Sequence, residues 1–266
     1  MIRMPARLFR MNLSLMNGVA AVGGCLLAPL PPGGGAVAAA FAGVTLLAMG
    51  ASAGNQLLER DLDALMQRTM GRPLPRRAMQ PRTAALLGFT AAACGFLLLA
   101  AVSLTASLLG LAALAWYLAV YTPLKRRTPL ALLFGALSGA LPPVIGWTLA
   151  GGSMSDFRVV LLAGLFFLWQ VPHFWLFQQR HADDYRRAGI PLFTITPASS
   201  GLWVVALALG TLLLPLFGVV GHACAPWFGL LALILPAIWL SRSEPARRTC
   251  LNLFPLLITL ALLAPH

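Results

Sequence analysis

The stretch NQLLERDLDALMQRTMGRP, residues 55–73, joins the end of an apolar segment to the densest group of acidic residues in the chain. The chain has seven acidic residues among 266, and three of them lie between positions 59 and 63. If a helix continues through this stretch, Asn55, Glu59 and Asp63 share one face over about 12 Å, whereas Asp61 points elsewhere. We therefore expect an apolar helix that ends in a row of oxygen ligands.

Composition places this helix in a bilayer. Hydrophobic residues make up 59% of the chain and charged residues 10%, and the mean hydropathy is +0.83, which is more apolar surface than one soluble core can bury. A helix needs about 20 mostly apolar residues to cross the hydrocarbon layer. Such runs predict an all-α membrane protein, a single domain over residues 1–266, with nine transmembrane helices at 12–30, 36–57, 84–104, 106–121, 129–150, 157–178, 202–221, 226–240 and 249–264.

The basic residues give an independent indication of topology. Of the 19 Lys and Arg residues, 18 precede the first span or lie in alternate loops on one side, and Arg158 alone lies on the other. Because Lys and Arg favour the cytoplasmic side, we expect a cytoplasmic N-terminus, an outside C-terminus and a multi-pass protein of the plasma (inner) membrane. This topology explains most of the +12 net charge, and no soluble domain accompanies it, which argues against a nucleic-acid partner.

The acidic face and the arginines that follow it predict a site for a metal-bound diphosphate. Mg²⁺ is usually held by a few carboxylates together with substrate phosphates. Arg68 and Arg72, four residues apart, follow the acidic face and offer forked donors to phosphate oxygens. The alternatives are a solvated helix end whose acids pair with Arg60 and Arg68, and arginines that serve topology alone.

Two further groups fall on the same side of the membrane. Asp183 and Asp184 follow the sixth span, so two acidic clusters from distant parts of the chain are expected to hold Mg²⁺ around a diphosphate, although an ordinary loop pair is the alternative. Lys125 lies between the clusters, one turn after Tyr121, and is the only lysine in the chain. Its compact ammonium group suits a phosphate oxygen. We expect the diphosphate site to face the cytoplasm.

Three stretches together resemble the UbiA superfamily of intramembrane prenyltransferases. They are NQLLERDLDALMQRTMGRPLP (55–75), YTPLKRRTPLALLFGALSGALPPVIGW (121–147) and FLWQVPHFWLFQQRHADDYRRAGIPL (167–192). The resemblance covers roughly residues 55–82 and 121–192, is closest to the branch that farnesylates haem, and implies a nine-helix bundle. The first motif of the family has Asp where this chain has Glu59, a side chain one methylene longer.

The resemblance implies an Mg²⁺-dependent enzyme that transfers a farnesyl group from farnesyl diphosphate to a vinyl group of haem b, giving haem O and diphosphate. It places the first metal motif at Asn55, Glu59 and Asp63 and the second at Asp183 and Asp184. These five residues and Lys125 form the expected catalytic set. The expected substrate-binding set is Arg68, Arg72, Tyr121, Arg126, His173 and Tyr185.

Two other classes of protein remain open at this point. One is a UbiA-type enzyme with a quinone precursor or another aromatic acceptor, against which the PHFW stretch at 172–175 and the DY pair at 184–185 argue. The other is a transporter or a non-catalytic assembly protein, but a transporter would place its acids near the bilayer midplane. We expect farnesyl diphosphate, haem b and the lipid bilayer as binding partners. A membrane protein of haem synthesis and a second copy of the chain are left open.

Overall fold

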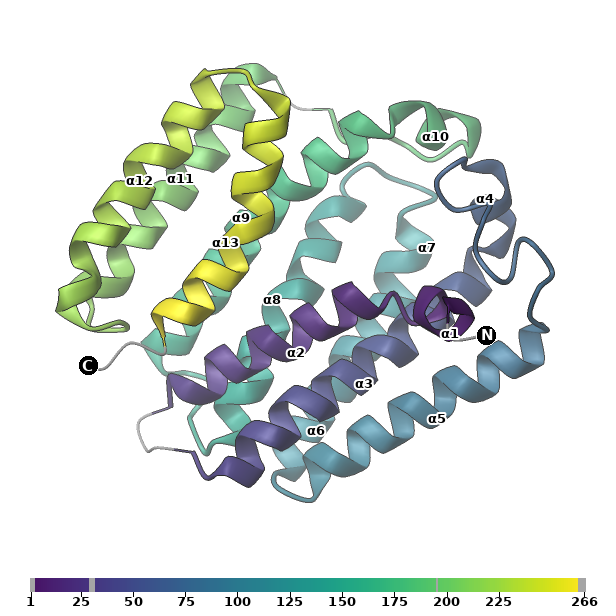
Figure 1. Ribbon diagram of the computed structural model, residues 1–266, viewed down its shortest axis with the longest axis horizontal. Helices are drawn as coiled ribbons and strands as arrows, with labels where there is room; N and C mark the ends of the chain where they lie inside the picture. Colours follow the sequence, from purple (N-terminus) through teal and green to yellow (C-terminus); the bar gives the residue numbers. More distant parts are fainter. Residues whose placement is uncertain (1–2, 29–31, 195, 263–266) are drawn as a thin grey trace.

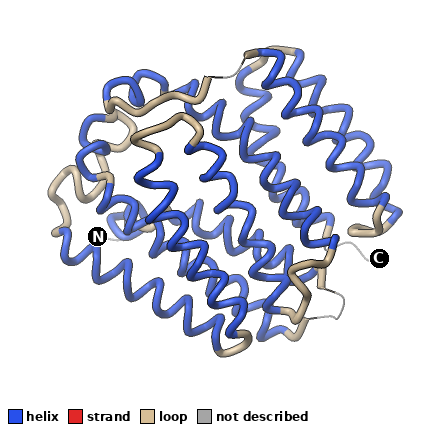
Figure 2. Tube along the Cα trace, turned by 180° about the vertical axis from the view of Figure 1, so that it is seen from behind, coloured by secondary structure: helices blue, strands red, loops and turns tan. Residues whose placement is uncertain are grey.

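The protein is described by a computed structural model that covers residues 3–28, 32–194 and 196–262. Within these residues it consists of helices and loops without a strand (Figure 1, Figure 2). The elements are α1 (Arg3–Leu8), α2 (Met11–Leu26), α3 (Gly34–Leu58), α4 (Arg60–Leu65), α5 (Pro81–Ala100), α6 (Leu104–Ala115), the π-helix η1 (Trp116–Tyr121), α7 (Thr122–Leu124), α8 (Ala131–Leu149), α9 (Phe157–Arg180), α10 (Ala182–Arg187), α11 (Pro197–Leu216), the 3₁₀ helix η2 (His222–Cys224), α12 (Ala225–Leu240) and α13 (Glu244–Ala261).

Each of the nine predicted spans falls largely on a helix, so the all-α prediction is confirmed. Seven helical segments in the described residues are long and apolar enough to cross a membrane: α3, α5, α6 through α7, α8, α9, α11, and η2 with α12. The other two predicted spans fall on α2, which has only 16 residues, and on α13, which carries Glu244, Arg247 and Arg248 in its first two turns. Hydropathy therefore located these helices correctly, but two of them are shorter or more polar than a typical span.

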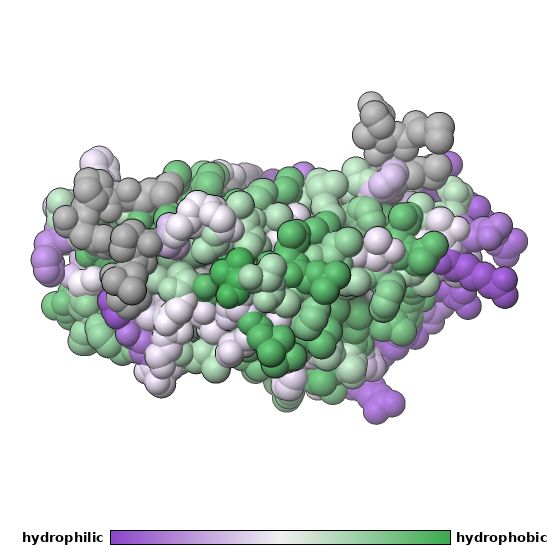
Figure 3. All heavy atoms as spheres, turned by 90° about the horizontal axis from the view of Figure 1, so that it is seen from below, coloured by the Kyte–Doolittle hydropathy of each residue, from purple (hydrophilic) through white to green (hydrophobic). Residues whose placement is uncertain are grey.

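The outer surface is apolar over much of its area. Side chains such as Phe89 on α5 and Leu240 on α12 are 74% and 80% exposed. Figure 3 shows hydrophobic residues across the middle of one face and hydrophilic residues gathered toward its edges. A contiguous apolar surface of this kind suits contact with lipid.

Close contact between α2 and α8 depends on glycine. A Cβ atom added at Gly24 would lie 1.8 Å from the carbonyl oxygen of Pro143, and one added at Gly146 would lie 1.8 Å from that of Ala21. No side chain larger than hydrogen fits at either position, because the neighbouring atoms belong to the backbone. Small residues allow helix backbones to approach in this way in membrane proteins.

Helix α8 also links the two parts of the bundle. Its Trp147 is fully buried in a core shared with α9, α11, α12 and α13, whereas its Ile145 packs with α2, α3 and α6. Beyond the start of α8, the short helices α4, α7 and α10 gather at the same end of the bundle (Figure 1). The predicted site residues lie mainly at this end.

We predict that Gly146→Ala lowers the stability of the fold by about 1–3 kcal/mol, because the added methyl group forces α2 away from α8. Thermal unfolding of the purified protein in detergent measures this change. Gly164→Ala on α9 is the matched control, since nothing lies within 4 Å of its added Cβ. Equal unfolding midpoints for the two variants would contradict the packing assignment.

Candidate functional site

The acidic face forms across a break between α3 and α4. Glu59 lies between the two helices with φ −108° and ψ 15°, so the single continuous helix predicted here is interrupted. The four-residue spacing nevertheless survives, because Glu59 N donates to Asn55 O at 2.9 Å and Asp63 N donates to Glu59 O at 2.8 Å. Asn55, Glu59 and Asp63 are 3%, 2% and 1% exposed, whereas Asp61 is exposed.

Each buried carboxylate of this face is paired with a cation. Lys125 Nζ lies 2.8 Å from both carboxylate oxygens of Glu59, and Arg72 Nη1 donates to the two oxygens of Asp63 at 2.9 and 2.7 Å. Burial raises the pKa of Asp63, although Arg72 acts in the opposite direction. For Lys125, burial acts to lower the pKa, but Glu59, together with Tyr121 and Tyr185, outweighs burial and raises the pKa. The site therefore contains two buried ion pairs, in which one cation neutralises each carboxylate.

Asn55 is oriented by a residue that the sequence analysis missed. Its Nδ2 donates to Thr122 Oγ1 at 3.2 Å, and the Thr122 hydroxyl donates to Tyr117 O at 2.8 Å. Thr122 follows directly on η1, and π-helical turns often occur at functional sites. The one available signal was its position between Tyr121 and Lys125 in the YTPLK stretch.

Arg126 lies outside the buried face. Its guanidinium group makes two bonds to the exposed Asp61 carboxylate, at 2.8 and 2.9 Å, and donates to Leu58 O at 2.6 Å. The structure thus brings Arg126 to the outer side of α4, whereas Lys125, its neighbour in sequence, reaches the inner side. Of these two residues, only Lys125 contacts the buried acidic face.

The second acidic pair divides in the same way. Asp183 is 84% exposed and pairs with Arg186. Asp184 is buried and accepts hydrogen bonds from the backbone N–H groups of Gln67 and Arg68, at 2.8 and 3.1 Å, and from the Arg187 side chain. Burial opposes ionisation of Asp184, but these hydrogen bonds prevail and lower its pKa.

Asp184 therefore fastens the loop that follows α4, which carries Arg68 and Arg72, to the start of α10. The Arg68 guanidinium lies 4.9 Å from the Phe177 ring centroid on α9, a second contact between this loop and the later part of the chain. In the described residues, no three His, Cys, Asp or Glu side chains lie close enough to share a metal ion. The predicted meeting of both acidic clusters around a common metal is not seen.

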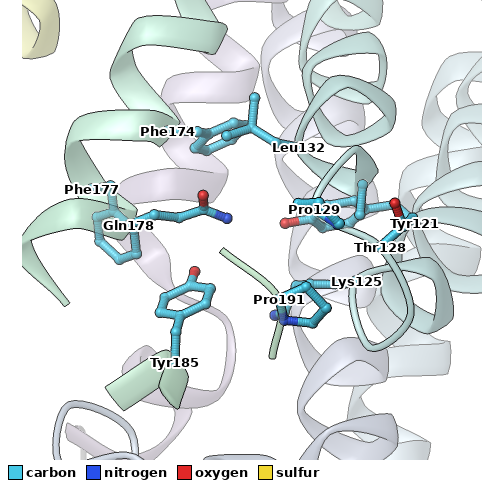
Figure 4. Close-up of a pocket in the computed structure, with 11 residues that line it drawn as sticks. Tyr121, Lys125, Thr128, Pro129, Leu132, Phe174, Phe177, Gln178, Tyr185 and Pro191 are labelled. Atoms are coloured by element: carbon cyan, nitrogen blue, oxygen red, sulfur yellow. The ribbon is translucent and has the colours of Figure 1, made fainter. Parts of the chain in front are cut away.

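A small pocket adjoins the ion-paired face (Figure 4). Its volume of about 20 Å³ holds about one water molecule. Tyr121, Thr128 and Leu132 face Gln178 and Tyr185 across it, and Lys125 also lines it. The Gln178 Oε1 atom accepts a hydrogen bond from Phe193 N at 3.2 Å, which holds the following segment against the pocket. Tyr121, Lys125 and Tyr185, which come from three separate parts of the chain, thus line the same pocket.

His173 does not line this pocket. Its ring stacks on Trp169 with centroids 4.9 Å apart, and Trp169 in turn stacks on Phe254 of α13. Trp169 Nε1 also donates to Leu251 O at 2.7 Å. His173 therefore belongs to an aromatic group between α9 and α13.

The donor set of the first motif fits a hard cation. Two carboxylates and a carboxamide lie on one buried face, and carboxylate and carbonyl oxygens are the ligands that Mg²⁺ prefers. The Glu59 Oε1 atom, moreover, is buried without a hydrogen bond, although Lys125 lies close to it. Lys125 and Arg72 contact the carboxylate oxygens that a metal ion would need, so an ion bound there would displace them.

Long apolar helices with a charged, compensated site at one end define a helical membrane protein with a polar binding site. Residues 17–258 match the UbiA prenyltransferase family. The chain belongs to this family and is a multi-pass integral membrane prenyltransferase.

Two curated relatives are similar over most of their length. The protoheme IX farnesyltransferase of Geobacter sulfurreducens is 57% identical over 99% of this chain and 99% of its own. The protein of the same name from Oleidesulfovibrio alaskensis is 40% identical over 82% of this chain and 79% of its own.

Two solved structures share the fold. A UbiA homologue from Aeropyrum pernix K1 has a TM-score of 0.76 at 23% identity and covers 95% of this chain and 96% of its own. A UbiA homologue from Archaeoglobus fulgidus bound to DMAPP and Mg²⁺ has a TM-score of 0.78 at 16% identity, with 98% of both chains covered. The UbiA-like fold that the sequence predicted is therefore confirmed.

We predict that Asp184→Ala releases the loop after α4, whereas Asp183→Ala leaves it in place. Removing a buried acceptor of three donors should lower stability by about 1–3 kcal/mol, while an exposed ion pair contributes about 0–1 kcal/mol. Tryptic cleavage within residues 68–77 and the unfolding midpoint measure the effect. Similar cleavage rates for the two variants would show that Asp184 does not hold the loop.

Proposed function

We propose that the protein transfers a farnesyl group from farnesyl diphosphate to a vinyl group of haem b, producing haem O and diphosphate in an Mg²⁺-dependent reaction. The name and high identity of the Geobacter sulfurreducens relative support the substrates. The observation that carries the chemistry is the row Asn55, Glu59 and Asp63, with Lys125 and Arg72 seated on its carboxylates. A diphosphate needs both kinds of group, metal ligands and cations.

Asn55, Glu59 and Asp63 are the proposed metal ligands. When bound, Mg²⁺ would neutralise charge on the departing diphosphate. Lys125, Arg72 and Arg68 bind diphosphate oxygens through charge-assisted hydrogen bonds. In the second motif, Asp184 holds the loop that carries Arg68 and Arg72. Asp183 is exposed beside Asp184 and adds a negative charge at the edge of the site.

Breaking the bond between farnesyl C1 and oxygen sends the electron pair to the diphosphate and leaves an allylic cation. Phe174, Phe177 and Tyr185 line the pocket beside Lys125 and favour a cation through their ring faces. A dry wall also delays attack by water. The terminal vinyl carbon of haem then bonds to farnesyl C1, and water supplies the hydroxyl group of the hydroxyethylfarnesyl product and releases a proton.

The aromatic group around His173 is the proposed contact for the haem acceptor. His173 directly precedes Phe174, which lines the pocket, on α9. A haem acceptor in contact with His173 therefore lies beside the pocket wall. The proposed topology has nine membrane spans, with α2 and α13 as the two additional ones. In the predicted topology, 18 of the 19 basic residues share one side of the membrane with the site, which supports a site that faces the cytoplasm.

We predict that Asp63→Asn reduces haem farnesylation by about 100-fold or more, because it removes a charged metal ligand. Purified protein in lipid is given farnesyl diphosphate, haem b and Mg²⁺, and mass spectrometry detects the hydroxyethylfarnesyl product. The matched control is Asp61→Asn, which changes an exposed acid of the same helix and should stay within about twofold. Chelation of Mg²⁺ should abolish the product in all samples.

Full activity of Asp63→Asn would defeat the metal assignment. Prenylation of a different ring while haem stays unchanged would overturn the acceptor and leave the metal assignment intact.

We predict that Thr122→Val raises the Mg²⁺ concentration needed for half-maximal activity about tenfold, since residues that orient a metal ligand have effects of this size. The KM for farnesyl diphosphate at saturating Mg²⁺ should change little. Thr105→Val, an exposed threonine on α6, is the control. A loss of activity that is independent of Mg²⁺ concentration would contradict the orienting role.

A further inference from the structure

A second polar cluster lies where α9, α12 and α13 meet, and none of its residues lines the pocket. The rings of Trp175 on α9 and Trp239 on α12 have centroids 5.8 Å apart. The Arg247 guanidinium of α13 lies 4.7 Å from the Trp239 ring centroid, and its Nη2 atom donates to the Trp239 carbonyl. Three helices thus contribute to the surroundings of Trp239. The junction between α12 and α13 lies at the same end of the bundle as the short helix α10 (Figure 1).

Two donors in this cluster lack an acceptor. Trp175 Nε1 and Arg247 Nε are buried, and neither has a hydrogen-bond partner. Buried N–H groups are normally paired, because an unpaired donor has lost its water without gaining an acceptor. Both residues contact Trp239, so the cluster offers donors from two helices and has no protein oxygen for them.

The cluster also carries uncompensated positive charge. Among the described residues, Arg242, Arg247 and Arg248 take part in no ion pair. Glu244, the nearest acid in sequence, is exposed and pairs with none of them. An anion with several acceptor oxygens would satisfy both the free donors and the charge.

The surroundings favour an anion that carries hydrocarbon chains. Leu240, next to Trp239, is 80% exposed, and Leu233 on the same helix is 73% exposed. An apolar helix surface therefore leads directly away from the basic cluster. Paired Arg and Trp side chains at a helix end are also typical of the membrane interface.

We propose that Trp175, Arg247 and the adjacent arginines bind the phosphate group of an anionic phospholipid, whose acyl chains lie along the exposed face of α12. The indole N–H and the Arg247 Nε–H donate to phosphate oxygens, and Arg242 and Arg248 supply further charge. None of these residues lines the pocket beside Lys125, so this binding is separate from the proposed reaction.

The test compares lipid binding by the intact protein and its variants. Delipidated protein in detergent is titrated with phosphatidylglycerol, phosphatidylcholine or inorganic phosphate, and native mass spectrometry and thermal shift report binding. We expect phosphatidylglycerol to bind most tightly. Arg247→Gln should weaken it about tenfold and Trp175→Phe, which keeps the ring and removes the N–H, about threefold. Arg82→Gln, at an exposed arginine on α5, should change nothing.

Equal affinity for phosphatidylcholine and phosphatidylglycerol would overturn the proposal, and so would protection by inorganic phosphate alone at the same concentration. Wild-type affinity in Trp175→Phe would remove the indole from the site and overturn the assignment. If Arg247→Gln does not fold, the graded loss in Trp175→Phe decides the question. Haem farnesylation is measured separately, so its absence would leave the lipid result unaffected.

Discussion

Charge compensation between buried groups holds the site together. Glu59 and Asp63 are nearly inaccessible to water, and a carboxylate in such a position is tolerated only when it is paired. Lys125 reaches Glu59 from 66 residues away, and Arg72 reaches Asp63 from the following loop. These two pairs fix the end of α7 and the loop after α4 against the acidic row, which places Lys125 and Arg72 at the same end of the bundle.

The later part of the chain completes this arrangement through Asp184. Its carboxylate binds two consecutive backbone N–H groups 116 and 117 residues away, so the loop with Arg68 and Arg72 depends on α10 for its position. Helix α8, in close contact with α2 through Gly146, connects the same two parts inside the bundle. The site is therefore built across the molecule, although its acidic row belongs to one local segment.

The sequence predicted what depends on local pattern. Hydropathy located the helices, and the four-residue spacing put Asn55, Glu59 and Asp63 on one face and Asp61 outside it. The sequence could not distinguish Asp183 from Asp184, because the two are adjacent aspartates that differ only in the face of α10 that each occupies. The break at Glu59 and the hydroxyl of Thr122 were likewise hidden, since both depend on contacts with distant helices. The same limit applies to the setting of His173, because its ring partner Trp169 packs on Phe254 of α13.

The pairing of Glu59 with Lys125 and of Asp63 with Arg72 leaves these two carboxylates neutralised before any ligand binds. A metal ion that bound alone would displace Lys125 and Arg72 from the carboxylates and leave both cations unpaired. A diphosphate that bound alone would pair with these cations and leave the carboxylates unpaired. If the two entered together, the carboxylates would gain the metal as Lys125 and Arg72 gained the diphosphate oxygens, so no charged group would be left without a partner. Under the proposed function, the magnesium salt of the prenyl donor, rather than either component in turn, would be the species that suits these paired charges.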